Sequence, residues 1–428
     1  MLIQFSFENY KCFKDKVTIN LEAPKGTPRL YTNPSRKRNG VFKTSAVYGS
    51  NASGKTKLFE AFRFMKAVVT PPKRGGKIPV LDYWQTKYDP FRLNTYSKER
   101  KSSFETVILV DRNIYRYGFE LNRTGFLTEW LYRTSNDSET LVFSRDGMSI
   151  EYNRDLLNQT IADSILSAGM VSPTVGFLSV LQTLNEPLAK KIVSWFDHAA
   201  VISANEIGES MPLDALSDND KKKYVVDFLK SFDINIEDVS LHEMDLDDIP
   251  EKIKMIIGED YLKGEVYDGI RTLHKQYNDL YEKEGEVWFS MEKDESYGTN
   301  RLVTLSWPIL NALQNDSVIF IDEFDSGIHP IVAQTIVELF YMLKTKAQLI
   351  INTQNVLFLK SKTTENKKLF GKDQILLVSK NRYGESSVSS LTEYGNDIQR
   401  NLDSLYLEGD FGAIPYIVMD RLDELVKK

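Results

Sequence analysis

The chain has 428 residues, of which 42% are hydrophobic and 27% charged, with a net charge of −6. This composition is typical of a globular protein with a large core and excludes a disordered or collagen-like chain. The negative charge argues against a protein that coats nucleic acid through its overall charge. The single cysteine, Cys12, excludes a disulfide framework and a cysteine-rich zinc site. No stretch approaches the ~20 apolar residues of a membrane span, so we expect a cytoplasmic protein without a membrane anchor.

Alternating apolar and polar residues predict strands over residues 2–7 and 16–21. Three or four β-rich runs within residues 104–143, separated by short turns, predict an antiparallel meander. Apolar residues then recur at helical spacing from about residue 155 to residue 200. The segment 217–234 is typical of a capped amphipathic helix.

After residue 286, apolar runs alternate with segments whose apolar residues recur at helical spacing. Helices are predicted from Ser296 to Leu313 and after Pro330. The apolar runs between and around them, each predicted as a strand, are 287–291, 317–322, 347–353 and 374–380. Strands that alternate with helices indicate a parallel or mixed sheet.

Residues 49–56, GSNASGKT, fit the phosphate-binding pattern G-x-x-x-x-G-K-[ST] between an apolar strand and an amphipathic helix. Glycines let backbone N–H groups curl around a phosphate, and the helix N-terminus adds partial positive charge. Lys55 supplies a charge to the β- and γ-phosphates, and the Thr56 hydroxyl is placed for Mg²⁺. The expected nucleotide-binding residues are Gly49, Ser50, Asn51, Ala52, Ser53, Gly54, Lys55 and Thr56.

Residues 318–323, VIFIDE, form an apolar run that ends in two carboxylates. A buried strand has this pattern, and ligands bind at the carboxyl ends of strands in α/β sheets. We expect Asp322 to help hold Mg²⁺ and Glu323 to polarise the attacking water. The separation between Thr56 and Asp322 is long for a compact nucleotide-binding fold, which indicates an insertion.

Residues 295–302, ESYGTNRL, place a Ser-x-Gly at the start of a predicted helix, where it fits either an anion site or a plain N-cap. The order of P-loop, Ser-x-Gly, acidic strand and DSGIHP resembles the ABC/SMC-type ATPases. More narrowly, the chain resembles the RloA/AbiL ATPases of bacterial abortive-infection systems, which are related to the ATPase domain of OLD nucleases. Further segments carry this resemblance: MLIQFSFENYKCFKD, PFRL, NEPLAKKIVSWF, KDQILLVSKN and YLEGDFGAIP.

The resemblance implies a head-to-head homodimer with two nucleotides between the subunits. In that arrangement Ser296 and Gly298 of one subunit contact the γ-phosphate held by Lys55 of the other. The family usually has a histidine after the strand that follows the acidic one, and Gln354 stands in that place here. Glutamine can hydrogen-bond a phosphate oxygen or a water but cannot carry charge. We therefore expect slow or partner-dependent turnover, with Glu323 essential and Gln354 in the place of the switch histidine.

The implied fold class is α/β: an ABC/SMC-type P-loop ATPase head, a mixed sheet with flanking helices, and an inserted β-meander and helical region. The predicted organisation assigns the N-terminal half of the ATPase lobe to residues 1–103 and its C-terminal half to 285–428. Between them lie an antiparallel β segment, 104–152, and a helical or mixed insertion, 153–284, as the expected partner-binding region.

The leading hypothesis is an ATP- and Mg²⁺-dependent sensor or scaffold of an anti-phage system. Resemblance implies a separate effector, a Toprim-type protein like RloB, and a phage-encoded trigger. A DNA-binding repair ATPase of the SMC type and a non-hydrolysing ATP-sensing scaffold remain alternatives. Basic runs at 36–38, 73–74 and 98–101 are solvated loops or, together, a nucleic-acid or partner face, so direct nucleic-acid binding stays open.

Overall fold

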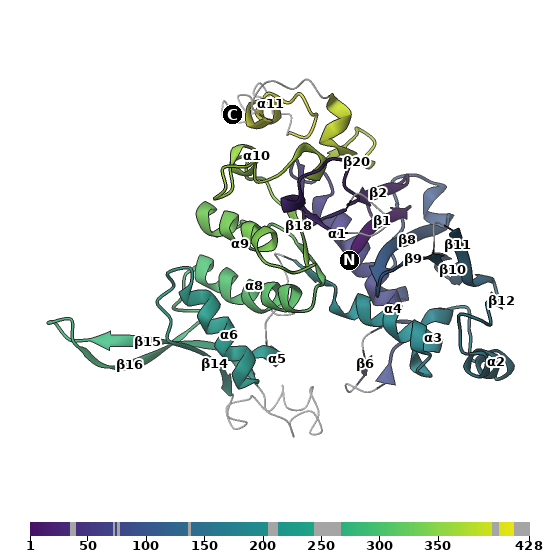
Figure 1. Ribbon diagram of the computed structural model, residues 1–428, viewed down its shortest axis with the longest axis horizontal. Helices are drawn as coiled ribbons and strands as arrows, with labels where there is room; N and C mark the ends of the chain where they lie inside the picture. Colours follow the sequence, from purple (N-terminus) through teal and green to yellow (C-terminus); the bar gives the residue numbers. More distant parts are fainter. Residues whose placement is uncertain are drawn as a thin grey trace, which may run out of the picture. The chain divides into compact units, whose positions relative to one another are not determined.

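The computed structural model describes most of the chain, and its contacts divide it into two compact units (Figure 1). Unit 1 comprises Met1–Ser203, Ala312–Phe324 and Gln334–Lys428, and unit 2 comprises Ala204–Asn311 and Asp325–Ala333. Among the described residues, none of the helices combines the length and apolar character needed to cross a bilayer. The described residues are 1–34, 40–71, 73–74, 78–135, 138–203, 213–243, 267–395 and 402–414.

A six-stranded sheet in unit 1 has the order β13-β17-β18-β5-β19-β20, with all neighbours parallel except β19 and β20. Every residue of β5, β17 and β18 is buried, which explains why their sequences are apolar runs rather than alternating ones. The strands are β13 (Ala200–Ile202), β17 (Val318–Ile321), β18 (Gln348–Asn352), β5 (Thr44–Gly49), β19 (Ile375–Lys380) and β20 (Ser386–Ser390).

Helix α1 (Lys55–Val69) follows β5 directly and packs on this sheet. The ring of Phe62 stacks on that of Phe320 in β17, with centroids 4.4 Å apart, and Phe59 meets Phe320 edge-on at 5.3 Å. The α1–β17 contact therefore joins the helix after the P-loop to the acidic strand through aromatic packing. The other helices around this sheet are α9 (Pro330–Met342), which begins in unit 2, α10 (Leu357–Lys360) and α11 (Leu402–Glu408).

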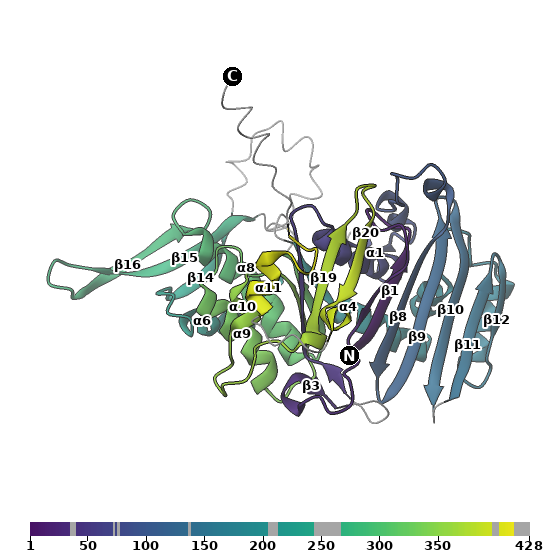
Figure 2. The same cartoon turned by 90° about the horizontal axis from the view of Figure 1, so that it is seen from above.

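The second large sheet of unit 1 is antiparallel, with the order β12-β11-β10-β9-β8-β1-β2 (Figure 2). Its consecutive strands β8 to β12 are joined by short turns, which confirms the predicted meander. The N-terminal strand β1 joins this sheet by pairing with both β2 and β8. The strands are β1 (Leu2–Glu8), β2 (Val17–Asn20), β8 (Ser102–Val110), β9 (Asn113–Asn122), β10 (Gly125–Ser135), β11 (Ser138–Asp146) and β12 (Ser149–Tyr152).

The helices α2 (Gln159–Ser167), α3 (Phe177–Thr183) and α4 (Pro187–His198) follow the meander, as the helical spacing predicted. Unit 1 also holds short elements: β3 (Thr32–Asn33), β4 (Val41–Phe42), β6 (Lys73–Arg74), β7 (Ile78–Pro79), η1 (Arg29–Tyr31), η2 (Tyr83–Thr86), η3 (Ser97–Glu99), η5 (Lys372–Gln374) and η6 (Leu391–Tyr394).

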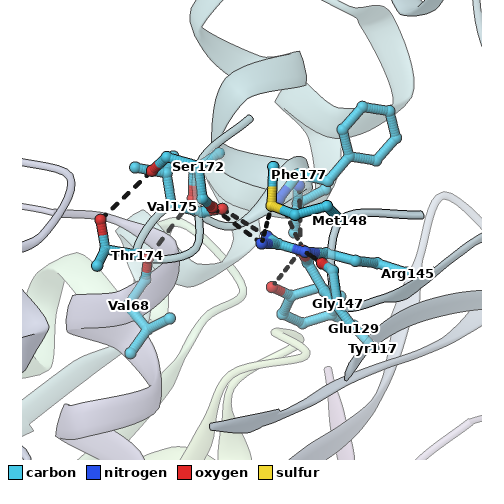
Figure 3. Close-up of polar contacts among 12 residues, drawn as sticks. Val68, Tyr117, Glu129, Arg145, Gly147, Met148, Ser172, Thr174, Val175 and Phe177 are labelled. Atoms are coloured by element: carbon cyan, nitrogen blue, oxygen red, sulfur yellow. Dashed lines mark hydrogen bonds and ion pairs between the residues drawn. The ribbon is translucent and has the colours of Figure 1, made fainter. Parts of the chain in front are cut away.

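A fully buried ion pair, Arg145 and Glu129, ties the meander to the start of α3 (Figure 3). Glu129 accepts hydrogen bonds from the backbone N–H of Phe177 at 2.7 Å and from the Tyr117 hydroxyl at 3.0 Å. Arg145 donates to three backbone carbonyls, those of Gly147, Ser172 and Val175. Because both charges are hydrogen-bonded, the cluster can remain buried in the core.

The basic run 98–101 carries ion pairs rather than free charge at two of its positions. Arg100 lies 3.2 Å from Glu8, and Lys101 lies 2.8 Å from Glu120. These contacts favour the solvated-loop interpretation for this run. Residues 36–38 lie outside the described residues.

Unit 2 contains the capped helix that the sequence predicted and a three-stranded sheet of which the sequence predicted only the strand at 287–291. Helix α6 (Asn219–Lys230) is capped by Asp218, whose side chain accepts from the backbone N–H groups of Asp220 and Lys221. The sheet is antiparallel with the order β14-β15-β16, and β15 and β16 form a long hairpin (Figure 1). The remaining elements are α5 (Leu213–Leu216), β14 (Asp238–Glu243), β15 (Tyr267–Tyr277), β16 (Lys283–Ser290) and α8 (Tyr297–Gln314), which begins in this unit.

Candidate functional site

The P-loop turns sharply between β5 and α1, and two of its positions accept only glycine. A Cβ on Gly49 would lie 2.4 Å from the carbonyl oxygen of Val378. Gly54 has a left-handed φ of 118°, and a Cβ there would lie 2.8 Å from the Cys12 sulfur and 2.9 Å from the Ser386 hydroxyl. The glycines thus allow the backbone to lie close to these neighbouring atoms. Helix α1 then begins with N–H groups that have no partner within the helix.

Lys55, the first residue of α1, is 7% exposed and folds back over the loop. Its Nζ donates to the carbonyl of Gly49 at 2.7 Å and to the carbonyl of Ser50 at 2.9 Å. Burial lowers the pKa of Lys55, while the negative charges of Asp322 and Glu323 oppose that shift. The ammonium group is therefore held within the loop by oxygen atoms that phosphate oxygens can replace.

Asp322 follows β17 and meets residues from two other elements at the carboxyl edge of the sheet. The Thr56 hydroxyl donates to Asp322 Oδ1 at 3.2 Å, and the Asn352 amide donates to the same oxygen. Asp322 is 3% exposed, and burial raises the pKa of its carboxyl group, with the charge of Glu323 adding to the shift and the two hydrogen bonds opposing it. The structure thus brings the two predicted Mg²⁺ ligands together and adds Asn352, which sequence reasoning missed.

The oxygen donors of Thr56 and Asp322 fit Mg²⁺, which prefers hydroxyl and carboxylate ligands. A carboxylate whose charge is disfavoured by burial gains from a nearby cation, so the raised pKa of Asp322 agrees with this assignment. Bound there with a nucleotide, Mg²⁺ would neutralise part of the charge on the phosphate oxygens.

Glu323 differs from its neighbour Asp322 because it is exposed and has a left-handed φ of 46°. Such a conformation is uncommon for a residue with a long side chain and marks a sharp turn after β17. The N–H of Phe324 donates to the carbonyl of Asn352 at 3.0 Å, which fixes this turn against the end of β18. The turn separates a buried carboxylate suited to a cation from an exposed one suited to a water molecule.

Gln354 lies just beyond β18, and its side-chain amide donates to Asn51 Oδ1 in the P-loop at 2.8 Å. Gln354 is therefore in direct contact with the loop that would hold the phosphates. A neutral amide at this point can hydrogen-bond a phosphate oxygen or a water without adding charge.

The predicted signature residues Ser296 and Gly298 belong to unit 2, whereas the P-loop belongs to unit 1. Ser296 is exposed at the start of α8, and its hydroxyl accepts from the backbone N–H of Thr299 at 3.1 Å. A Cβ on Gly298 would lie 2.6 Å from the carbonyl of Gly327, so glycine is required for this close approach. The Tyr297 hydroxyl lies 3.4 Å from that of Ser326. The signature and the loop after the acidic strand are therefore in contact within unit 2.

Heads of SMC proteins are among the solved structures with some similarity to the chain. One is an SMC head bound to the C-winged helix domain of ScpA (14% identity, TM-score 0.44, covering 91% of this chain and 97% of that chain). Another is the SMC head of Thermotoga maritima (14% identity, TM-score 0.38, covering 91% of this chain and 98% of that chain). A third, with an extended coiled coil and derived from Pyrococcus furiosus, is bound to the C-terminal domain of ScpA (13% identity, TM-score 0.39, covering 96% of this chain and 99% of that chain). A comparison with curated proteins gave no match.

A family model described as "AAA domain, putative AbiEii toxin, Type IV TA system" matches residues 45–158 and 194–360. The matched ranges hold the P-loop, the signature, the acidic strand and Gln354. The fold is α/β, with a mixed sheet in which β5 carries the P-loop and β17 the acidic pair, as the sequence predicted. Because the match covers more than half of the chain, the protein belongs to this family of AAA domains.

Proposed function

We propose that this protein is an ATP-dependent switch that binds ATP with Mg²⁺, closes into a head-to-head dimer and hydrolyses ATP slowly. The observation that carries the proposal is the cluster at the sheet edge, where Thr56 and Asn352 both donate to Asp322. This cluster joins the P-loop, the acidic strand and the strand between them at one point. The Thr56 hydroxyl and the Asp322 carboxylate in this cluster are oxygen ligands of the kind that a magnesium–nucleotide complex needs.

Each residue has a distinct role in the proposed hydrolysis. Lys55 and the backbone N–H groups of the P-loop bind the phosphates, while Thr56 and Asp322 hold the cation. The exposed carboxylate of Glu323 accepts a proton from the attacking water as a general base. Gln354 orients that water or a phosphate oxygen through a neutral amide, so less charge is stabilised in the transition state than with a histidinium. We therefore expect turnover slower than about 1 s⁻¹, the lower end of the usual enzyme range.

Closure of two copies would complete the pocket, because the exposed Ser296 and the glycine at 298 would bind the γ-phosphate held by the other copy. ATP would then have a higher affinity for the closed dimer than for the open chain. Such a difference in affinity is what allows a nucleotide to drive a conformational equilibrium.

The biological setting that we propose is anti-phage abortive infection, with this chain as the sensor or scaffold subunit. The sequence resemblance to RloA/AbiL ATPases supports this setting, and the matched family model is described as "AAA domain, putative AbiEii toxin, Type IV TA system". A separate Toprim-type effector, similar to RloB, would be held or released according to the nucleotide state. A phage-encoded component would supply the trigger.

The test combines Glu323→Gln with Lys55→Ala. Glu323→Gln should lower hydrolysis by about 10²- to 10⁴-fold, the usual contribution of a general base, and should accumulate an ATP-loaded dimer. Lys55→Ala should weaken ATP binding at least about 100-fold because it removes the buried cation of the P-loop. Lys57→Ala is the matched control, since Lys57 lies one position past Thr56 and pairs with Glu60 at the surface. Hydrolysis, binding of a fluorescent ATP analogue and sedimentation velocity measure these effects.

Three outcomes would contradict the proposal. If Lys55→Ala retains native ATP affinity, the P-loop is not the binding site. If Glu323→Gln accumulates no more dimer than wild type, the result favours the alternative of a non-hydrolysing ATP-sensing scaffold. Salt-sensitive binding of duplex DNA by the isolated chain, enhanced by ATP, would favour a DNA-repair ATPase instead.

A further inference from the structure

The turn that leads into the signature helix is tied to the three-stranded sheet of unit 2. The N–H of Ser290, the last residue of β16, donates to Asp294 Oδ2 at 2.7 Å, and the N–H of Asp294 donates back to the carbonyl of Ser290 at 2.9 Å. The N–H of Met291 donates to the carbonyl of Ile270 in β15 at 2.9 Å. Because Asp294 lies two residues before Ser296, the position of the sheet determines where the signature begins.

A side-chain cluster adds a second connection between the sheet and the signature. Glu295, the residue just before Ser296, accepts through Oε1 from the Thr272 hydroxyl at 2.5 Å and lies 2.7 Å from His274 Nε2. An ionised carboxylate only accepts, so His274 Nε2 carries the hydrogen in this contact. The side chain of Glu295 is 10% exposed and that of His274 is 21% exposed. Two donors on one largely buried carboxylate oxygen hold it in a single orientation.

The register places His274 at a structural boundary within the sheet. Strand β14 pairs with β15 only as far as Asp238 opposite Leu273, whereas β15 and β16 continue to Tyr277 opposite Lys283. From His274 outward, the sheet is therefore a two-stranded hairpin, an arrangement that is marginally stable alone. The two-stranded part of the hairpin therefore begins at the residue that contacts Glu295.

We propose that His274 is a positioning residue for the signature, which acts through Glu295 to set where Ser296 meets the nucleotide of a second copy. This inference deepens the proposed function and rests on it, since it requires that Ser296 bind in the dimer. Without the donor from His274, the Glu295 carboxylate is free to turn toward water and to shift the adjoining backbone. A shift of about 1 Å in a positioned group is enough to weaken binding of the closed state.

Two substitutions separate the hydrogen bond from the packing of the imidazole ring. The His274 ring lies 4.7 Å from that of Phe289, so it also has an apolar contact. His274→Phe keeps a ring for this contact but removes the donor, whereas His274→Gln keeps a donor near the position of Nε2 but removes the ring. Gln276→Ala is the matched control, because Gln276 is exposed and lies two residues further along the same face of β15.

The experiment uses the full chain with Glu323→Gln, ATP and Mg²⁺, and measures dimerisation by sedimentation velocity. His274→Phe should weaken the ATP-dependent dimer about tenfold, which is the usual effect of losing a hydrogen bond to a charged acceptor. His274→Gln should remain within about twofold of the parent, and Gln276→Ala should equal it. Binding of a fluorescent ATP analogue, measured at protein concentrations too low for dimers, should be the same in all four proteins.

The results distinguish this inference from the proposed function. If the parent dimerises and His274→Phe dimerises equally well, the positioning role is wrong and the proposed function stands. If His274→Gln is as weak as His274→Phe, a donor near the position of Nε2 does not restore the dimer, and the inference is overturned. If the parent itself stays monomeric with ATP, the proposed function fails and the inference fails with it.

Discussion

The P-loop in unit 1 and the signature in unit 2 differ in what supports them. The P-loop extends from β5, and Asp322 from β17, strands in which every residue is buried. The signature is connected to a sheet whose hairpin exposes Leu280 to 77% and Tyr281 to 90%. Segments with few buried contacts open and move at lower free-energy cost than packed strands. The residues of the proposed chemistry are therefore held by buried strands, whereas the proposed signature is held by a sheet that moves more easily.

The strongest test of rigid support in unit 1 is Arg145→Met. This change leaves the buried Glu129 carboxylate without its counter-charge and leaves three backbone carbonyls without a donor. We expect a loss of about 3–5 kcal/mol in the free energy of unfolding, measured with urea. Arg133→Met is the control, because Arg133 is partly exposed and donates to Asn113 on the same sheet. A loss below about 1 kcal/mol for Arg145→Met would show that this part of unit 1 is not rigidly packed.

Asp322→Asn is expected to raise the free energy of unfolding, by less than Arg145→Met lowers it. Burial raises the pKa of Asp322, so the folded state favours the protonated form, and wild-type stability falls as the pH rises above the ordinary value of 3.8. The asparagine variant lacks this loss. Its advantage in unfolding free energy should grow as the pH rises from 4 to 7, while Mg²⁺-dependent ATP binding is lost. Thermal melting without nucleotide at both pH values measures the difference, and an equal melting temperature at pH 7 would contradict it.

The smallest effect is expected at the tip of the hairpin in unit 2. Leu280→Ser removes an exposed side chain and should change the unfolding free energy by less than about 0.5 kcal/mol. Urea unfolding of the full chain provides the measurement. A loss above about 1 kcal/mol would mean that the tip is packed in the folded protein, and the contrast between the two units would be smaller than we infer.

The sequence predicted the parts of the site whose signals are local. The P-loop has a fixed spacing, and Asp322 ends an unbroken apolar run, so both were found without knowing their neighbours. Asn352 was missed, although it also ends a buried apolar strand. Its contact with Asp322 follows once β18 is paired with β17, because the carboxyl ends of parallel strands meet at one edge.

The contact between His274 and Glu295 could not be predicted in the same way. It depends on the register of β15, and the apolar residues Ile270 and Leu273 in that strand do not alternate with polar ones. Arg145 was missed for a different reason. Arginine is rarely buried, and nothing local to residue 145 indicates that the loop before α3 supplies carbonyls for it.

The position of β5 in its sheet also has a consequence for biosynthesis. Its neighbours are β18 and β19, which end at Asn352 and Lys380, some 300 residues later in the chain. At a translation rate of about 5–20 residues per second, β5 waits roughly 15–65 s for both partners. The edges of a buried, apolar strand are unpaired for that time and need protection from aggregation. The sheet edge that brings the P-loop and Asp322 together is therefore completed only after most of the chain has been made.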